Sequence, residues 1–214
     1  QMKKNQIFIY LLIVHSGQLF AQDSLSFQFP SYSNATIVYK NGSSTQEKIN
    51  YNFAEQRLYF VDKKDNQIKV VSSTESIALI RMGDRKFLMD VDGLKEVVAE
   101  DPLIYVQMKA KTKAKAKTIG YGGSDGVASV TTYSEFKSGG QISILENDAY
   151  EVSSVYKIYW IVKNNKRKLI TNFKQLQKMY PKNKEQISNY IETKNVNFDN
   201  VTQFVDLVKY AESL

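Results

Sequence analysis

The chain has 214 residues, a formal net charge of +7, a single histidine and no cysteine. The histidine, His15, lies in an N-terminal segment that we expect to be removed as a signal peptide, so the mature chain would have neither residue type. This composition excludes Ser-His-Asp and Cys-His nucleophilic catalysis and zinc sites built on histidine or cysteine. It leaves open carboxylate, lysine and tyrosine chemistry, and calcium or magnesium held by oxygen ligands.

Residues 2–21 are predicted to form the signal peptide. Lys3 and Lys4 provide a positively charged start, Ile7 to Val14 is an apolar run of eight, and Ala21 is a small residue at the expected cleavage point. An apolar run of that length is too short to span a bilayer, which needs about 20 residues. We therefore expect a soluble exported protein that is periplasmic, associated with the outer membrane or secreted.

The expected mature chain is modestly basic. Removal of residues 1–22, which carry two lysines and no acidic residue, leaves 27 basic and 22 acidic residues and a net charge of +5. This excess does not by itself argue for nucleic acid as a partner. A length of roughly 190 residues suits one domain or two small ones and can bury a core without disulfides.

Residues 23–170 are predicted to form a β-rich domain. Short apolar segments at intervals of about 8 to 12 residues, separated by turn residues, favour a mostly antiparallel meander or open barrel. The predicted strands are 35–39, 46–53, 57–61, 67–71, 76–82, 86–89, 97–99, 103–108, 127–133, 141–145, 155–162 and 167–170. The alternating segment 23–33 predicts either a first strand or an extended arm.

Residues 171–214 are predicted to form about three helices that pack on the β-rich domain, which makes the fold class α+β. Two asparagines, Asn172 and Asn183, each precede a glutamine by three residues, the spacing of a capping box. Asp199 or Asn200 is expected to cap a last helix whose apolar residues recur at i, i+3, i+4 and i+7. This amphipathic face predicts packing against the sheet, with a docking face for another protein as the alternative.

Lysine occupies every second position after the predicted strand 103–108. The row consists of Lys109, Lys111, Lys113, Lys115 and Lys117. This alternation favours a strand over a helix. Because strand side chains alternate between faces, a strand here would place all five ammonium groups on one side. Such a strip would attract phosphates, acidic glycans or an anionic membrane surface, with an affinity that falls as salt rises. The alternatives are a solvated edge strand protected by its lysines, or a mobile loop.

Three further features have a structural and a functional interpretation. The turn Asp90-Val91-Asp92-Gly93 is a fragment of a calcium-binding loop, but the rest of an EF-hand pattern is missing and a plain turn is favoured. The glycine-rich stretch Gly120 to Gly126 lacks a P-loop ending and is expected to connect two strands. Trp160 could line a sugar platform, although aromatic side chains more commonly build β cores.

Eight short motifs occur along the chain in an order that can be compared with that of known exported proteins. They are Phe20-Ala21-Gln22, Asn50-Tyr51-Asn52, Leu58-Tyr59-Phe60, Arg85-Lys86-Phe87, Tyr105-Val106-Gln107, Lys109-Ala110, Gly120-Tyr121-Gly122-Gly123 and Met179-Tyr180-Pro181. Together with the closing helices, they resemble a group of exported proteins of Bacteroidota to which no activity is assigned. The resemblance implies a cell-envelope or secreted location in a Gram-negative cell and carries no catalytic residues with it.

The sequence therefore predicts a non-enzymatic exported cell-envelope protein that binds a protein, a lipid or a polyanion such as an acidic glycan. The lysine row supplies the candidate binding residues, and no catalytic residue, metal, cofactor or nucleic-acid partner is predicted. Two alternatives stay open. One is a carrier that holds an apolar ligand in a curved sheet, and the other is a carboxylate-dependent glycan hydrolase, which needs two acids across a cleft.

Overall fold

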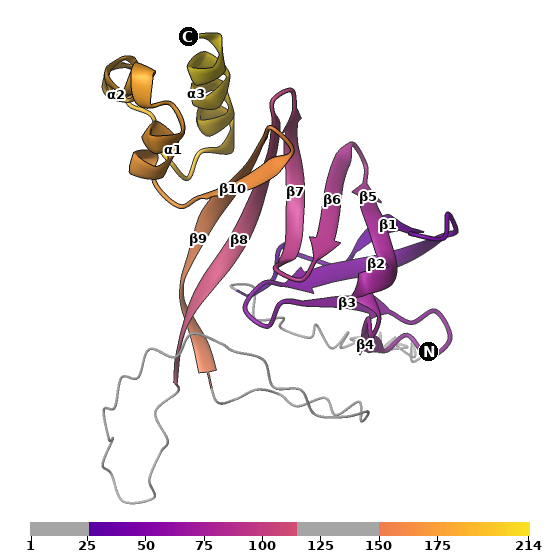
Figure 1. Cartoon of the computed structure of the whole chain (residues 1–214). Coiled ribbons are helices and arrows are strands. Elements are labelled where there is room, and N and C mark those ends of the chain that lie inside the picture. Colours follow the sequence, from indigo (N-terminus) through magenta and orange to yellow (C-terminus); the bar gives the residue numbers. More distant parts are fainter. Residues whose placement is uncertain (1–25, 115–149) are drawn as a thin grey trace, which may run out of the picture.

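A computed structural model describes residues 26–114 and 150–214, which form a ten-stranded antiparallel sheet with three α-helices at one end (Figure 1). The predicted α+β class is confirmed. The expected signal peptide, Lys115 and Lys117, the glycine-rich stretch and the predicted strands 127–133 and 141–145 lie outside the described residues.

The sheet combines a meander with one inserted strand. Its strands are β1 Ser33–Tyr39, β2 Ser44–Asn52, β3 Arg57–Val61, β4 Ile68–Val70, β5 Ile77–Met82, β6 Arg85–Asp90, β7 Gly93–Glu100, β8 Leu103–Ala114, β9 Tyr150–Lys163 and β10 Lys166–Ile170. Their order across the sheet is β10-β9-β8-β7-β6-β5-β1-β2-β3-β4. The chain therefore runs outward from β1 to β4 and returns through a short 3₁₀ turn, Thr74–Ser76, to pair β5 with the other side of β1.

The N-terminal segment is an arm and contains no strand in its described part. A single bridge joins Phe27 to Asn52, and the amide of Phe29 donates to Oδ1 of Asn50 at 3.1 Å. Phe29 is buried in the sheet's core and meets Phe87 edge-on at 5.6 Å between ring centres. Of the two possibilities for residues 23–33, the extended arm is correct from Ser26 to Tyr32, and Ser33 begins β1.

The turn between β9 and β10 shows why this hairpin forms so sharply. Lys163 lies opposite Lys166, which leaves Asn164 and Asn165 as a two-residue loop. Their φ angles are 52° and 58°, so both have the left-handed conformation that a type I′ turn requires. Asparagine tolerates this conformation better than most residues, which fixes the register of the hairpin.

The three helices are α1 Phe173–Met179, α2 Lys184–Thr193 and α3 Val201–Ser213. Asn172 and Asn200 cap α1 and α3 as predicted, because each side chain accepts a hydrogen bond from the amide three residues on. The predicted cap at Asn183 is wrong. A 3₁₀ turn, Pro181–Asn183, leads directly into α2, and the Asn183 side chain makes no capping bond.

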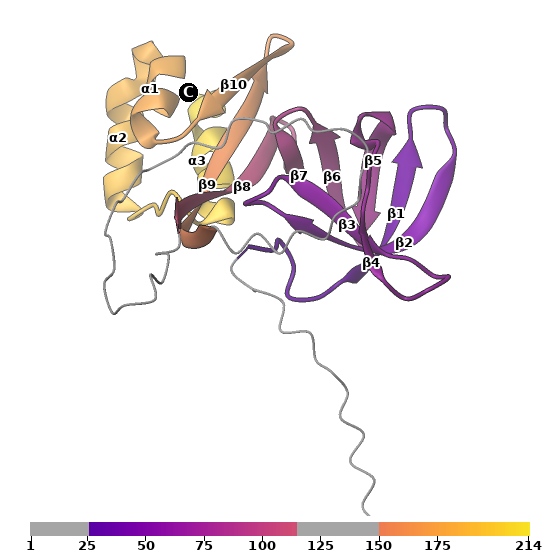
Figure 2. The same ribbon diagram turned by 90° about the horizontal axis from the view of Figure 1, so that it is seen from below.

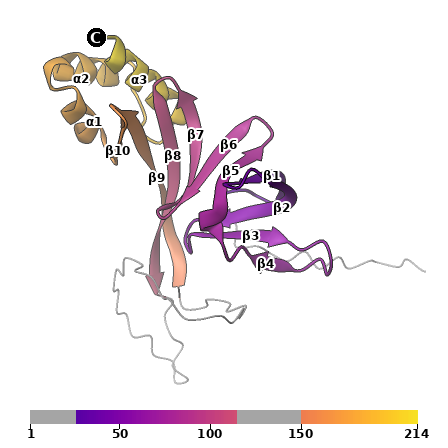
Figure 3. The ribbon, with the colours of Figure 1, turned by 45° about the vertical axis from the view of Figure 1, so that its right-hand side comes forward.

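The helices cover one face of β8, β9 and β10, and the same face is covered further along where the sheet curls over itself (Figures 2 and 3). Under the helices, Tyr159 of β9 stacks on Phe204 of α3 at 3.7 Å between ring centres. Leu207 and Val208 of α3 are also fully buried in this cluster. The predicted packing of the amphipathic last helix on the sheet is thus confirmed. The curled end has its own core, which includes Ile37, Ile49, Leu58, Ile80 and Phe87.

Candidate binding face of the sheet

The sheet face opposite the helices is continuous across eight strands. Tyr159 points to the helices, so its neighbour Trp160 points the other way. The strand register then places a row of directly opposed residues on this second face: Gln46, Thr36, Arg81, Lys86, Val97, Tyr105, Trp160 and Leu169. We call the face defined by this row the outer face.

The lysine row belongs to the outer face for as far as the structure describes it. β8 continues as a strand to Ala114. Because side chains alternate between faces along a strand, the face that carries Tyr105 also carries Lys109, Lys111 and Lys113. The strand prediction for this part of the row is confirmed. Lys111 and Lys113 are exposed, and Nζ of Lys111 lies 5.9 Å from the ring centre of Tyr156 on the neighbouring strand. We call Lys109, Lys111 and Lys113 the cationic strip, and Tyr156 lies beside it on β9.

This strip lies on a two-stranded ribbon, residues 109–114 of β8 and 150–156 of β9, which projects away from the body of the sheet (Figures 1 and 3). β7 pairs with β8 only as far as Val106, and β10 pairs with β9 only as far as Tyr159. Within the described residues, the ribbon thus has no strand on either side. It is held at its base by the sheet and presents its lysines outward.

Lys109 differs from the other lysines of the strip because it lies at the base of the ribbon. Its Nζ donates to the backbone oxygen of Asp92 at 3.1 Å. Burial lowers the pKa of the Lys109 ammonium, and the nearby charge of Lys95 lowers it further, against the opposing effect of Asp92. We therefore expect Lys111 and Lys113 to carry more of any anion binding than Lys109.

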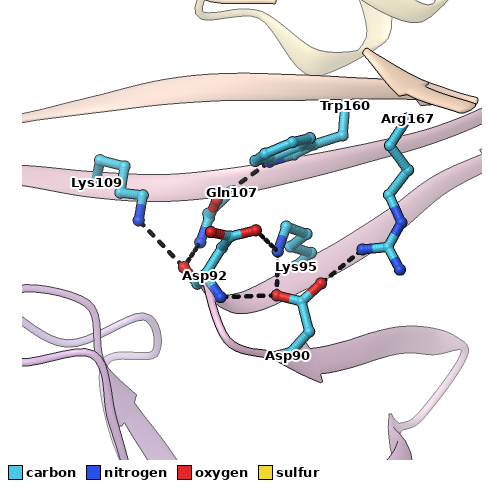
Figure 4. A network of polar contacts seen from close by, with 7 residues as sticks. All are labelled: Asp90, Asp92, Lys95, Gln107, Lys109, Trp160 and Arg167. Atoms are coloured by element: carbon cyan, nitrogen blue, oxygen red, sulfur yellow. Dashed lines mark hydrogen bonds and ion pairs between the residues drawn. The ribbon is translucent and has the colours of Figure 1, made fainter. Parts of the chain in front are cut away.

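A network of charged side chains lies next to this base (Figure 4). Lys95 of β7 is only 1% exposed and bonds Oδ1 of Asp90, with Oδ2 of Asp92 at 3.6 Å. Arg167 of β10 donates to Oδ2 of Asp90 at 2.6 Å. Burial alone would raise the pKa of Asp90, but the hydrogen bonds from Lys95 and Arg167 outweigh it and hold that pKa below its usual value. Asp90 of β6 is thus ionised and connects this strand to β7 and β10 through its ion pairs with Lys95 and Arg167.

Two neutral side chains complete the network. The Gln107 amide donates from Nε2 to the backbone oxygen of Asp92 and accepts from Nε1 of Trp160 at 3.1 Å. The ammonium of Lys95 lies 5.0 Å from the Trp160 ring centre, within the range of a cation–π contact. Trp160 is half-buried on the outer face, so it lies outside the main core in which the sequence most simply placed it. Its indole N–H is satisfied by Gln107.

The turn Asp90 to Gly93 is a hairpin turn between β6 and β7, as the simpler interpretation predicted. Asp90 lies opposite Gly93, and Oδ1 of Asp90 accepts from the amide of Asp92 at 3.0 Å. The carboxylates that a calcium ion would need are engaged by Lys95 and Arg167. No group of three or more metal-ligating side chains occurs among residues 26–114 and 150–214.

Sequence reasoning missed Lys95, Gln107 and Arg167. Lys95 and Gln107 are fully buried polar residues within strands of mixed composition, and no local pattern distinguishes them from exposed ones. Arg167 meets Asp90 across 77 residues of sequence. The sheet register, which the sequence does not reveal, is what brings these residues together.

Comparison of the chain with protein-family models, with curated proteins and with solved structures finds no match. The resemblance to exported Bacteroidota proteins therefore stays a prediction. None of the helices in the described part of the chain is long and apolar enough to cross a membrane.

Proposed function

We propose that this protein is a non-enzymatic exported binding protein of the cell envelope that holds an acidic partner against the lysines of its ribbon. The observation that carries the proposal is the position of Lys111 and Lys113, which are exposed on one side of a ribbon that projects from the sheet. Lys109 and Lys111 are like charges on one face of the ribbon and repel each other, so an anion bound beside them would reduce this repulsion. Two ribbons of the same kind would repel as well, which favours a different, acidic molecule over a second copy of this chain.

The structure offers less support for the two alternatives. A carrier of an apolar ligand needs a cavity between sheet and helices, but Tyr159, Phe198 and Phe204 fill this space with ring contacts of 3.7 to 5.3 Å. A glycan hydrolase needs one carboxyl group that stays protonated near neutral pH. Asp90, which pairs with Lys95 beside Asp92, is held ionised instead.

The proposal is tested with defined anions at two salt concentrations. We expect the protein to bind at least one of three probes: polyglutamate, an acidic oligosaccharide, or vesicles that contain an anionic phospholipid. Binding should weaken sharply between about 50 and 300 mM salt, because the Debye length falls well below 10 Å in this range. Neutral dextran and vesicles of zwitterionic lipid serve as uncharged controls.

The lysines themselves are tested with a charge-matched pair of variants. K111Q/K113Q removes two charges from the ribbon, and K174Q/K209Q removes two exposed charges from α1 and α3. We expect the first variant to lose about tenfold or more in affinity and the second to bind as the wild type does. Equal affinity of the two variants for every probe would contradict the proposal.

A further inference from the structure

The outer face carries a hollow of about 710 Å³ at the curled end of the sheet, away from the ribbon. It lies over β1, β2 and β5 and is open to solvent. Its lining includes three cationic side chains, Lys48, Lys63 and Arg81, and three amide side chains, Asn34, Gln46 and Asn66. The volume falls within the range of about 300 to 1,000 Å³ that is typical of small-molecule sites.

Arg81 is placed where a structural role does not explain it. It lies directly opposite Lys86 on the neighbouring strand, and like charges in opposed positions destabilise a sheet. Lys86 is neutralised by Glu100, whose Oε1 lies 2.6 Å from its Nζ. The Arg81 side chain makes no hydrogen bond or ion pair with any described residue. An anion bound in the hollow would supply the counter-charge that Arg81 lacks among the described residues.

The other cations leave positive charge available in the hollow. Lys63 donates to the backbone oxygen of Gln46 and lies 3.3 Å from Glu47, the one acidic side chain among the described residues that line the hollow. Lys48 is exposed and has no side-chain partner among residues 26–114 and 150–214. Arg81 and Lys48 thus have no hydrogen-bond or ion-pair partner among the described residues, whereas Glu47 is paired with Lys63.

We propose that this hollow is an anion-binding site for an acidic oligosaccharide, one that carries carboxylate or sulfate groups. The planar guanidinium of Arg81 suits a carboxylate or sulfate, to which it can donate two parallel hydrogen bonds. The amides of Asn34, Gln46 and Asn66 can each donate and accept, which matches the hydroxyl groups of a sugar.

An extended acidic peptide fits this hollow less well. Peptides gain much of their affinity for sheets by pairing with an exposed strand edge. β1, which contributes three residues to the lining of the hollow, is paired with β2 on one side and with β5 on the other. A peptide backbone would therefore find no edge here, whereas sugar hydroxyls need only the side chains.

The hollow and the ribbon lie on the same face, and Arg81 is three strands away from β8. At about 4.8 Å between strands, this separation is about 14 Å across the sheet, and Lys111 lies about 20 Å further along β8 from Tyr105, the residue in register with Arg81. One acidic chain of several sugars would be long enough to contact both places. The proposal that one ligand contacts both places rests on the proposed function of the ribbon, whereas the proposal of an anion site in the hollow does not.

The test measures the binding of a fluorescently labelled hexamer of guluronic acid by anisotropy, with neutral maltohexaose and hexaglutamate as comparison ligands. We expect K48Q/R81Q to bind the acidic hexasaccharide about tenfold or more weakly than the wild type, because two charge-assisted contacts are lost. The helix variant K174Q/K209Q should bind normally, and maltohexaose should not bind. Unchanged affinity of K48Q/R81Q would overturn the inference. Hexaglutamate binding with equal affinity and equal loss in K48Q/R81Q would overturn the assignment to a sugar.

The melting temperature shows whether a variant loses affinity because it is misfolded. Because R81Q breaks no hydrogen bond or ion pair with a described residue and removes a cation opposite Lys86, we expect its melting temperature to equal or exceed that of the wild type while its affinity falls. R81K, which keeps the charge but loses the planar fork, should bind with intermediate affinity. A loss of affinity that is accompanied by a lower melting temperature in R81Q would contradict this account.

The ribbon variant K111Q/K113Q, measured with the same ligand, separates the two proposals. If only K111Q/K113Q binds more weakly, the proposed sugar site in the hollow is wrong and the proposed function of the ribbon is supported. Weakened binding in K48Q/R81Q alone would support the hollow and contradict the ribbon for this ligand. No binding by the wild type, or equal binding by all variants, would overturn the hollow as a sugar site and remove acidic oligosaccharides from the proposed partners of the ribbon.

Discussion

The ammonium group of Lys95 lies 5.0 Å from the ring centre of Trp160, enclosed so well that only 1% of the residue is exposed. The same group bonds Asp90 at the start of the β6–β7 turn. Trp160, in turn, belongs to β9, the strand that forms one side of the ribbon. The network around Lys95 therefore fixes the base of the ribbon to the sheet.

Removal of Lys95 should be far more damaging than its replacement by an apolar side chain. K95A leaves two carboxylates without their buried partner and also opens a cavity in the space of the buried side chain, and we expect a loss of about 3 kcal/mol in the free energy of unfolding. K95M fills the same space and should lose clearly less. Urea-induced unfolding followed by tryptophan fluorescence measures both, and equal losses in the two variants would show that the lost charge alone is responsible and would contradict a contribution from packing.

The stability of the protein should fall in acid partly through Asp90. Its pKa is held below its usual value in the folded protein, whereas in the unfolded chain it is about 3.9. The stabilisation from Asp90 is therefore fully present above about pH 4 and is lost as the pH falls through the lower, folded-state pKa. D90N should be less stable than the wild type at pH 7, and the difference should shrink toward pH 3. Unfolding free energies at pH 7, 5, 4 and 3 test this, and a difference that stays constant would contradict it.

Gly93 should not tolerate a side chain. Its φ is +102°, and a Cβ there would overlap the hydroxyl of Tyr51. We expect G93A to cost more than about 1 kcal/mol of stability. G42A is the matched control, because Gly42 has a φ of +85° but nothing within 4 Å of an added Cβ. The double variant Y51F/G93A should recover part of the loss, and a G93A variant no less stable than G42A would rule out the steric explanation.

The two asparagines at the starts of α2 and α3 should differ in their effect. The Asn200 side chain accepts a hydrogen bond from the amide of Gln203 at 3.2 Å, so N200A should lose about 1 kcal/mol. Asn183 makes no such bond, and N183A should change the stability by less than half of that amount. Thermal unfolding by circular dichroism compares the two, and equal destabilisation would contradict the assignment of the caps.

The sequence predicted the local features of this fold well. Alternation, turn residues and capping residues predicted at least part of each of the ten described strands, the three helices and the caps at Asn172 and Asn200. The first half of β7 and the start of β9 were not predicted. The lysine row was predicted as a strand because lysine occupies alternate positions, and this holds through Ala114 even though alanine and lysine are poor strand formers. Pairing with β9 along the whole ribbon supplies the stabilisation that local propensity lacks.

What the sequence did not reveal depends on long-range register. The insertion of β1 between β2 and β5 makes the hollow around Arg81, and no local pattern shows that the chain returns there after β4. The contact of Asp90 with Arg167 needs β6 and β10 to lie in one twisted sheet. Arg81 and Lys86 are five residues apart, yet their opposition is visible only once the β5–β6 turn is placed.

The most direct test of the central claim, that an acidic partner binds at the ribbon, is to map the contact residue by residue. Backbone amide NMR spectra would be recorded for the wild type while the tightest acidic probe is added at low salt. We expect the largest shifts at residues 109–114 and 150–156, with smaller ones around Arg81 for an acidic sugar, and their reversal at high salt. Shifts confined to the helices, with the ribbon unchanged, would contradict the claim.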